Sequence, residues 1–380
     1  MRGNDQKTWI EISKSALKKN LRTITSHVKP SGVMAVIKSN AYGHGLIEVA
    51  KTIASKVPYL VVDSIDEATL IRKAGIRTPI LIIGYIPPSR LIEIPKLKQV
   101  SFVAYHFTTL DQIKKIKAKP GQFHIHLKIE TGTTRQGLDG SELIKFAKTA
   151  QKIPSIIIEG IYTHYADVED TDEPKYAKLQ YKRFLEEKER LERIGFHPKI
   201  LHTASSAAAI LHPEMRLDNI RLGIALYGYW PDMRIKSAAK RLNPALELIP
   251  ALTWKTVIAQ VKAVKKGTPI SYGRTEKMKK DGKIAVLPVG YWDGIDRGLS
   301  SKGHVLIGGK CCKIMGRVCM NMMMVDVSAL KNVKTGDEVI LIGKQGSNQI
   351  NADEIAKTLG TISYEVITRI NPMIQRRLVA

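Results

Sequence analysis

A lysine that precedes a glycine-rich turn is the sequence feature best suited to chemistry. Lys38 closes the apolar run VMAVIK at 33–38, and the chain continues as SNAYGHG to residue 45. If this run is a barrel strand, its carboxyl end faces the active site, where a packed amine needs a partner. A lysine there can form a Schiff base with a carbonyl cofactor. Taken alone, the pattern fits a surface lysine after a strand equally well.

The elements around Lys38 predict a (β/α)8 barrel. Eight short apolar runs rich in β-branched residues lie at 33–38, 59–64, 79–84, 100–105, 123–129, 160–165, 199–204 and 219–228. Amphipathic helical patterns separate them, and one begins with Ser64 and Glu67 in capping-box spacing. Eight strand–helix alternations fit such a barrel better than any other common fold.

The pattern changes near Asn243 and Pro244. Beyond them, apolar runs separated by glycine-containing turns predict β-strands, and residues 351–360 predict one late helix with an Asn N-cap and a terminal Gly. We therefore predict a barrel domain over residues 1–240 and a smaller β-rich domain over 241–380. Residues 8–13 form a first strand that is able to join the second domain.

Composition bounds the class of protein. The chain has 380 residues, 44% hydrophobic and 25% charged, as expected for a globular protein of two domains. Its formal charge of +25 suggests affinity for anions, but the lysines are scattered without interleaved arginines and aromatics. We expect no specific nucleic-acid partner, no metal site and reduced cysteines. No long apolar run or secretion signal is evident, so we predict a cytoplasmic protein without membrane contact.

Four segments share their order and spacing with one known family. They are VMAVIKSNAYGHG (33–45), PISYGRT (269–275), GYWDGIDR (290–297) and GRVCMNM (316–322). The first resembles the cofactor-binding motif of alanine racemases, the second resembles the motif around their catalytic tyrosine, and the others resemble further stretches of their β domain. The resemblance covers essentially the whole chain. It implies pyridoxal 5'-phosphate at the barrel mouth and a homodimer in which the partner's β domain supplies the tyrosine.

The resemblance also implies a two-base mechanism with Lys38 and Tyr272 as catalytic residues. Racemisation needs one base to remove the α-proton on one face and a conjugate acid to return a proton on the other. The cofactor delocalises the resulting carbanion. A phenol has a pKa near 10 and needs help to act as a base. His164, in GIYTHYA, matches the family histidine that hydrogen-bonds this tyrosine.

Further positions match the family's cofactor-binding residues. Arg221 matches the arginine facing the pyridine nitrogen, which disfavours protonation of the ring, and His202 is expected to support it. Phosphate binding is assigned to the loops after the last two barrel strands and to two tyrosines. These residues are Ser206, Gly223, Ile224, Tyr42 and Tyr364.

Substrate binding falls to Arg135 and the backbone amide of Met320, since an arginine fork can bind both carboxylate oxygens. Lys128 matches a position that is carbamylated in several family members. The implied reaction is interconversion of L-alanine and D-alanine, which supplies peptidoglycan synthesis.

Three departures from the family pattern leave the substrate preference open. Residues 130–137 read ETGTTRQG where the family usually has DTGMGRLG, Asn321 replaces an aspartate, and Ser205 stands where asparagine is frequent. A serine or broad-specificity racemase is therefore the alternative within the same chemistry.

Other classes explain less of the sequence. A non-catalytic cofactor-carrying barrel lacks the β domain and its tyrosine, so Tyr272 argues against it. A decarboxylase on the same plan is expected to place an acidic residue at the pyridine nitrogen, which Arg221 contradicts. Only the net charge favours a nucleic-acid-binding protein.

Overall fold

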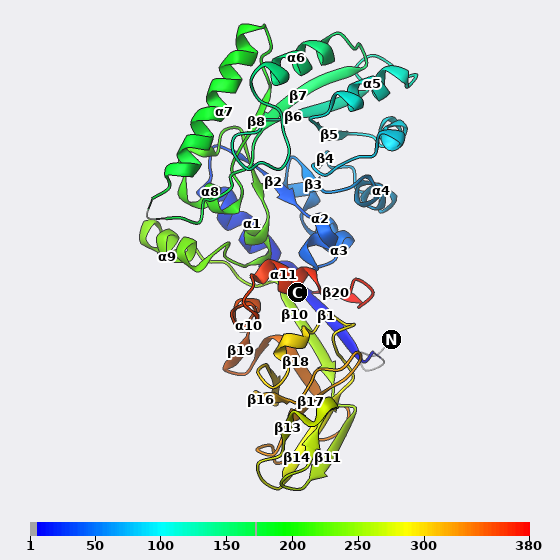
Figure 1. The fold of residues 1–380 in the computed structure, drawn as a ribbon, viewed down its shortest axis with the longest axis vertical. Helices are drawn as coiled ribbons and strands as arrows, with labels where there is room; N and C mark the ends of the chain where they lie inside the picture. The colour runs from blue at the N-terminus through cyan, green and yellow to red at the C-terminus, as the bar shows by residue number, and fades with distance from the viewer. Residues whose placement is uncertain (1–5, 172) are drawn as a thin grey trace. The chain divides into compact units, whose positions relative to one another are not determined.

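The computed structural model describes residues 6–171 and 173–380 and divides into two compact units (Figure 1). The barrel unit comprises Ser15–Ala41 and Val49–Pro250. The β unit comprises Met1–Lys14, Tyr42–Glu48 and Ala251–Ala380. The chain therefore enters the β unit three times, once through a short segment that follows Lys38.

In the described part of the chain, eight parallel strands form the nearly closed barrel, in the order β8-β7-β6-β5-β4-β3-β2-β9. Each predicted apolar run overlaps one of them, so the predicted fold class is confirmed, although β2 begins one residue and β7 four residues before the predicted run. Their bounds are β2 (Gly32–Val36), β3 (Leu60–Val62), β4 (Ile80–Ile82), β5 (Val100–Ala104), β6 (Phe123–Lys128), β7 (Ile156–Tyr162), β8 (Ile200–His202) and β9 (Asn219–Leu222). The Arg221 N–H donates to the Ala204 carbonyl at 2.9 Å, which ties β9 to the segment after β8.

The barrel strands are apolar because both of their faces are covered. Every residue of β3, β4 and β5 is buried, as expected for parallel strands between an interior and a helical layer. Helices α4 to α7 lie around the outside of the strands (Figure 1). The helices are α1 (Lys14–His27), α2 (Lys38–Tyr42), α3 (Leu46–Ile53), α4 (Ile65–Lys73), α5 (Phe107–Lys115), α6 (Gly140–Gln151), α7 (Lys175–Arg193), α8 (Ser206–Leu211) and α9 (Met233–Leu242).

Helix α6 illustrates why these segments are helical. Its buried residues recur at intervals of three or four, as one face of a helix requires, and they are Leu143, Phe146, Ala147 and Ala150. Helix α4 begins at the N-cap Ser64, whose side chain accepts a hydrogen bond from the Glu67 N–H. The Glu67 carboxylate bonds elsewhere, so only this half of the capping box forms.

The β unit contains a long, mostly antiparallel sheet of order β11-β14-β17-β16-β15-β18-β10-β1-β20, with β19 paired to β18. Strand β1 (Thr8–Ser13) pairs with β10 and β20, so the N-terminal strand belongs to this sheet. The other strands of this sheet are β10 (Leu252–Val257), β11 (Gln260–Val264), β14 (Gly282–Leu287), β15 (His304–Ile307), β16 (Lys310–Met315), β17 (Met323–Asp326), β18 (Glu338–Gln345), β19 (Asn348–Ile350) and β20 (Arg376–Val379). Strands β12 (Pro269–Ile270) and β13 (Glu276–Lys277) pair with each other as a separate two-stranded sheet.

The predicted late helix is confirmed as α10 (Ala352–Leu359). Asn351 and Glu354 form a complete capping box, and Gly360 ends the helix in the left-handed conformation. Helix α11 (Ser363–Thr368) follows.

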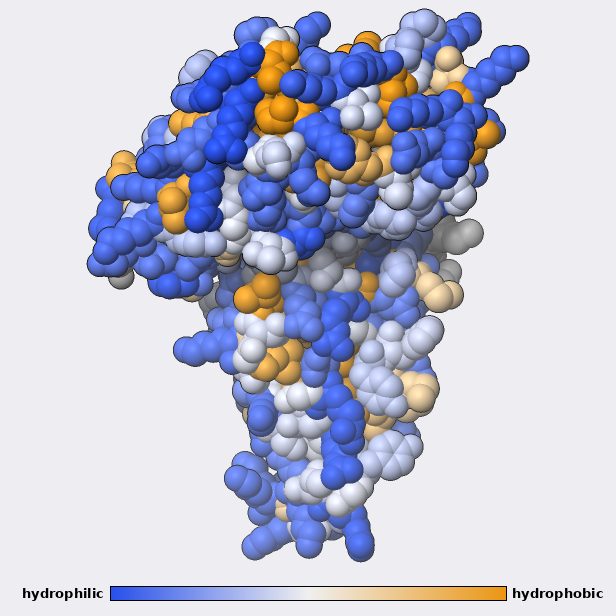
Figure 2. Space-filling model, turned by 45° about the horizontal axis from the view of Figure 1, so that its top comes forward, coloured by the Kyte–Doolittle hydropathy of each residue, from blue (hydrophilic) through white to orange (hydrophobic). Residues whose placement is uncertain are grey.

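On the face drawn in Figure 2, most residues are hydrophilic. Figure 2 shows a face on which hydrophobic residues occur only in scattered groups. Among the described residues, no helix combines the length and apolar character needed to span a bilayer.

Candidate active site

Lys38 lies just beyond the carboxyl end of β2, where it opens the short segment α2. The residues that follow have left-handed backbone angles, with φ of 56° at Ser39, 53° at Asn40 and 52° at both Ala41 and Tyr42. This conformation costs a non-glycine residue about 1–2 kcal/mol. Such a run persists only when surrounding groups hold it, which is common at functional sites.

The Glu67 carboxylate holds this turn. One oxygen accepts hydrogen bonds from the backbone N–H groups of Ser39 at 2.6 Å and Asn40 at 3.4 Å. The other oxygen accepts from the Asp63 N–H at 2.8 Å. Glu67 therefore joins the turn after Lys38 to the end of β3, a role that its capping-box spacing did not indicate.

Asp63 is the partner of the Lys38 amine. Lys38 Nζ lies 3.2 Å from Asp63 Oδ1, and the two side chains are 35% and 51% exposed. An ion pair this exposed adds little to stability. The ion pair matters for geometry, because it holds the Lys38 amine at the carboxyl ends of β2 and β3. Sequence reasoning missed Asp63, although its place directly after β3 could have indicated it.

A buried arginine forms the centre of the barrel site. Arg221 Nη1 donates to the His202 carbonyl at 2.7 Å and to His202 Nδ1 at 3.0 Å. Its Nη2 donates to the carbonyls of Thr163 at 2.8 Å and Thr203 at 3.0 Å, and to His164 Nδ1 at 3.3 Å. Burial lowers the pKa of Arg221 to about 10, which leaves it cationic at neutral pH.

Positive groups gather around Arg221. Lys128 is only 2% exposed, and its Nζ lies 4.6 Å from the centre of the Tyr162 ring. Burial, followed by the charges of Arg221 and Arg135, holds the pKa of Lys128 well below its usual range. Burial also holds the pKa of His164 well below its usual range, with contributions from Arg221, Lys128, Arg135 and Lys38. Arg221 therefore keeps its positive charge in the interior, whereas Lys128 and His164 favour their neutral forms.

Three of the five residues predicted to bind phosphate, Ser206, Gly223 and Ile224, lie after β8 and β9. Ser206 begins α8, and its Oγ accepts a hydrogen bond from the Gly223 N–H at 3.0 Å. Ile224 begins the short turn Ile224–Tyr227 and is buried. Because Ser206 Oγ accepts from Gly223, its own hydrogen remains for another acceptor.

Arg135 lies on an ordered loop. The Glu130 carboxylate accepts backbone hydrogen bonds from Gly132 at 2.5 Å, Thr133 at 2.6 Å and Arg135 at 3.4 Å. The Arg135 side chain is exposed. The segment ETGTTRQG is thus held by its first residue, which leaves the guanidinium available to a ligand.

The remaining predicted residues lie in the β unit. Tyr272 opens the turn Tyr272–Arg274 and is 72% exposed, and Met320 is 55% exposed. The rings of Tyr42 and Tyr364 lie 6.0 Å apart between centroids. Burial raises the pKa of Tyr42 to about 12, so its hydroxyl keeps its proton.

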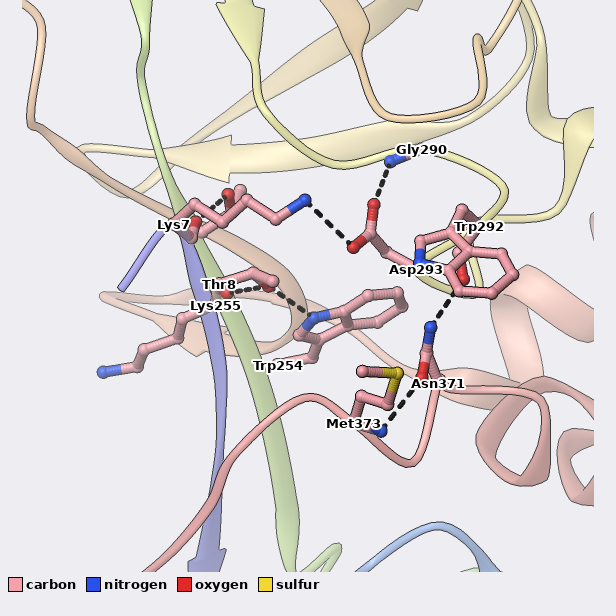
Figure 3. Close-up of polar contacts among 10 residues, drawn as sticks. Lys7, Thr8, Trp254, Lys255, Gly290, Trp292, Asp293, Asn371 and Met373 are labelled. Atoms are coloured by element: carbon pink, nitrogen blue, oxygen red, sulfur yellow. Dashed lines mark hydrogen bonds and ion pairs between the residues drawn. The ribbon is translucent and has the colours of Figure 1, made fainter. Parts of the chain in front are cut away.

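The GYWDGIDR segment is structural in the β unit (Figure 3). Buried Asp293 accepts from the Gly290 N–H at 2.9 Å and pairs with Lys7 at 3.3 Å. Asn371 Nδ2 donates to the Trp292 carbonyl at 3.1 Å. Asp293 therefore fixes a tight turn to residues from both ends of the chain.

The structure thus brings one set of predicted residues together in the barrel unit and carries the other set on the β unit. The first set is Lys38, Lys128, Arg135, His164, Ser206, Arg221, Gly223 and Ile224, and the second is Tyr42, Tyr272, Met320 and Tyr364. Among the residues that the structure describes, no three His, Cys, Asp or Glu side chains group as metal ligands do.

Comparison with known proteins agrees with this division. The profile of the family "Alanine racemase, N-terminal domain" matches residues 12–231, and that of "Alanine racemase, C-terminal domain" matches residues 251–378. The chain belongs to the alanine racemase family. The predicted family resemblance is therefore confirmed, and with it the class of amino-acid racemases.

Members of the alanine racemase family match along nearly their whole length. The alanine racemase of Methanococcus maripaludis is 38% identical over 372 residues, 97% of each chain. Alanine racemase 2 of Caldanaerobacter subterraneus subsp. tengcongensis is 39% identical, covering 97% of this chain and 94% of its own. The crystal structure of alanine racemase from Bacillus anthracis with bound L-Ala-P superposes with a TM-score of 0.90 at 34% identity, covering 99% and 95% of the chains.

Proposed function

We propose that this protein interconverts L-alanine and D-alanine, with pyridoxal 5'-phosphate bound through Lys38. The observation that carries the proposal is the cluster in the barrel unit, where the Lys38 amine at the end of β2 accompanies the buried Arg221 and its partner His164. Family membership over nearly the whole chain supports the same reaction.

The residues of the barrel unit fit this cofactor. Its aldehyde would bond to Lys38, and its ring nitrogen would face Arg221. The phosphate would bind the Ser206 hydroxyl and the backbone at Gly223 and Ile224, together with Tyr42 and Tyr364. The fit rests on the cationic Arg221 in the interior and on a serine hydroxyl with a hydrogen to donate. When bound, pyridoxal phosphate withdraws electrons from the substrate's α-carbon and makes its proton acidic.

Two side chains would move the proton. Lys38 Nζ would remove or return it on one face, and the Tyr272 hydroxyl would do so on the other. A neutral His164 that accepts from Arg221 through Nδ1 carries its hydrogen on Nε2. It could therefore donate to the oxygen of a deprotonated Tyr272 and stabilise the base. Arg221 keeps its proton at neutral pH, so it would orient its ligand without serving as an acid.

A second copy of the chain would complete the site. Tyr272 and Met320 are strongly exposed on the β unit, as residues that serve a partner's site would be. Arg135 and the Met320 amide would bind the substrate carboxylate, and carbamylation would convert buried Lys128 into an anion able to orient Arg135. We place the enzyme in the cytoplasm, where D-alanine would supply peptidoglycan.

The direct test is to incubate the purified holoenzyme with single L-amino acids and to separate the products by chiral chromatography. L-alanine should approach an equal mixture of enantiomers, and L-serine should react much more slowly. Faster conversion of serine would favour the serine or broad-specificity alternative. No conversion of any amino acid would contradict the proposal.

A further inference from the structure

Four polar side chains form a continuous hydrogen-bonded chain inside the barrel unit. Arg221 Nη1 contacts His202 Nδ1 at 3.0 Å, and His202 Nε2 contacts His126 Nδ1 at 2.9 Å. His126 Nε2 contacts Glu159 Oε2 at 3.3 Å. Both histidines are fully buried. The chain therefore links Arg221 to a carboxylate that does not touch it.

Local backbone features build this chain. The ladder between β6 and β7 shifts register, so that Ile125 pairs with Ile158 and His126 pairs with Gly160. Glu159 is the extra residue of this bulge, and bulges re-aim side chains. A Cβ on Gly160 would lie 2.7 Å from His126 Nδ1, so only a glycine leaves room for the histidine contact.

Arg221 and Glu159, at the two ends of this series of hydrogen bonds, determine which ring nitrogen of each histidine carries a hydrogen. Arginine only donates and a carboxylate only accepts. His202 Nδ1 must therefore accept from Arg221, which puts the hydrogen of a neutral His202 on Nε2. His126 Nδ1 must then accept from His202, and the hydrogen of His126 lies on Nε2 and points to Glu159. The hydrogen positions that Arg221 requires are therefore the same as those that Glu159 requires.

A second proton on His126 would break this order. It would direct an N–H toward His202 Nε2 and force the His202 hydrogen onto Nδ1, against the Arg221 donor. Burial holds the pKa of His202 well below its usual range, so it stays neutral. Burial opposes ionisation of Glu159, but hydrogen bonds from His126 and Ser101 outweigh it and lower its pKa to about 2. Glu159, which ends this series of hydrogen bonds, is therefore an ionised acceptor.

We propose that Glu159 is a positioning residue for Arg221. Acting through His126 and His202, it fixes the one arrangement of hydrogens in which His202 accepts from the guanidinium. Within the described part of the chain, the hydrogen-bond partners of Arg221 are carbonyl oxygens and imidazole nitrogens, and Glu159 reaches it only through the two histidines. The functional consequence rests on the proposed function, in which Arg221 faces the cofactor ring.

The first test reads the hydrogen positions directly. Protein labelled with 15N-histidine, without cofactor, is studied by long-range 1H–15N NMR at pH 7, with His126→Gln and His202→Gln variants for assignment. We expect both imidazoles to carry one hydrogen, on Nε2. A hydrogen on Nδ1 of either ring, or a doubly protonated ring, would overturn the proposal. This result does not depend on the enzyme's activity or substrate.

The second test changes the carboxylate. Glu159→Gln keeps the shape but lets an amide donate toward His126, so His202 should populate the Nδ1–H form. In the holoenzyme kcat for racemisation should fall about tenfold with little change in KM, as when a residue that orients a ligand is lost. Conversion of the cofactor to its amine form should rise relative to racemisation.

Glu187→Gln is the matched control. Glu187 is a buried carboxylate of the same unit, and it is not one of the four hydrogen-bonded residues from Arg221 to Glu159. It should leave the histidine spectra and kcat unchanged. A Glu159→Gln protein with wild-type spectra and kcat would refute the positioning role. If that variant does not fold, the wild-type spectra still decide the hydrogen positions, and Gly160→Ala offers a second way to displace His126.

Discussion

The two units expose several of their predicted site residues in opposite ways. In the barrel unit, Arg221 and Lys128 are buried and His164 is partly buried, and burial lowers the pKa of all three. In the β unit, Tyr272 and Met320 are strongly exposed. A buried polar network of this kind is costly to desolvate and is rigid once formed. The difference supports the proposal that the barrel unit holds the cofactor and that the β unit offers side chains to a second copy.

Removing the barrel unit's reactive amine should have the largest effect. Lys38→Ala deletes both the cofactor's attachment and one base, so racemisation should fall below detection and the purified protein should lose its yellow colour. Chiral chromatography and absorbance spectra measure the two effects. Lys51→Ala, an exposed lysine on α3, is the control and should behave as wild type. Turnover near the wild-type rate in Lys38→Ala would rule out its assigned role.

Tyr272→Phe tests the role of the exposed tyrosine on the β unit. It removes a proton-transfer group but keeps the ring, so racemisation should fall about 10²–10⁴-fold in both directions while the cofactor stays bound. Deuterium uptake from D₂O should be nearly lost for L-alanine and should persist for D-alanine through Lys38. Equal exchange of both enantiomers in this variant would exclude Tyr272 as the base for L-alanine.

Glu67→Ala probes how much the site depends on its strained turn. The change leaves the N–H groups of Ser39, Asn40 and Asp63 without their acceptor. Misplacing Lys38 should lower kcat about 10- to 100-fold. Hydrogen exchange in the cofactor-free protein should quicken over residues 36–42. Asp66→Ala, which removes a neighbouring exposed carboxylate, should change neither measurement.

Mixing two inactive variants tests whether one active site takes Lys38 from one copy of the chain and Tyr272 from another. Lys38→Ala and Tyr272→Phe subunits that exchange freely should form mixed dimers with one intact site each. Activity should return to about a quarter of the wild-type level per site, because half of the dimers are mixed. Subunit exchange is checked by native mass spectrometry. If exchange occurs and no activity returns, each site must be built within one copy.

Acid should weaken the barrel unit through Glu159. Its folded pKa of about 2 lies below the unfolded value of 4.5, so its contribution to stability is present above pH 4.5 and is lost as the pH falls toward 2. The gap in Tm between wild type and Glu159→Gln should therefore narrow by a few degrees between pH 6 and pH 3. Calorimetry of the cofactor-free proteins measures it. A gap that is constant over this range would show that the carboxylate is not stabilised by its partners.

Much of the architecture could be predicted because it is encoded over short distances. Apolar runs of the right length predicted the barrel strands, and Asn351 with Gly360 predicted α10. The family motifs identified Lys38 and Tyr272 as residues to examine. Hydrophobic periodicity and helix caps involve residues a few positions apart, so a sequence displays them directly.

The contacts that shape the site could not be predicted in this way. Asp63 meets Lys38 from 25 positions away, and His126 on β6 meets His202 on β8 from 76 positions away, because the closed barrel brings distant residues together. Glu67 looked like half of a capping box, yet its carboxylate holds the left-handed turn. By itself, the sequence determined the strands, the helices and the reactive residue types. Only the tertiary structure decided which donor meets which acceptor, because that depends on strand register and on a single bulge at Glu159.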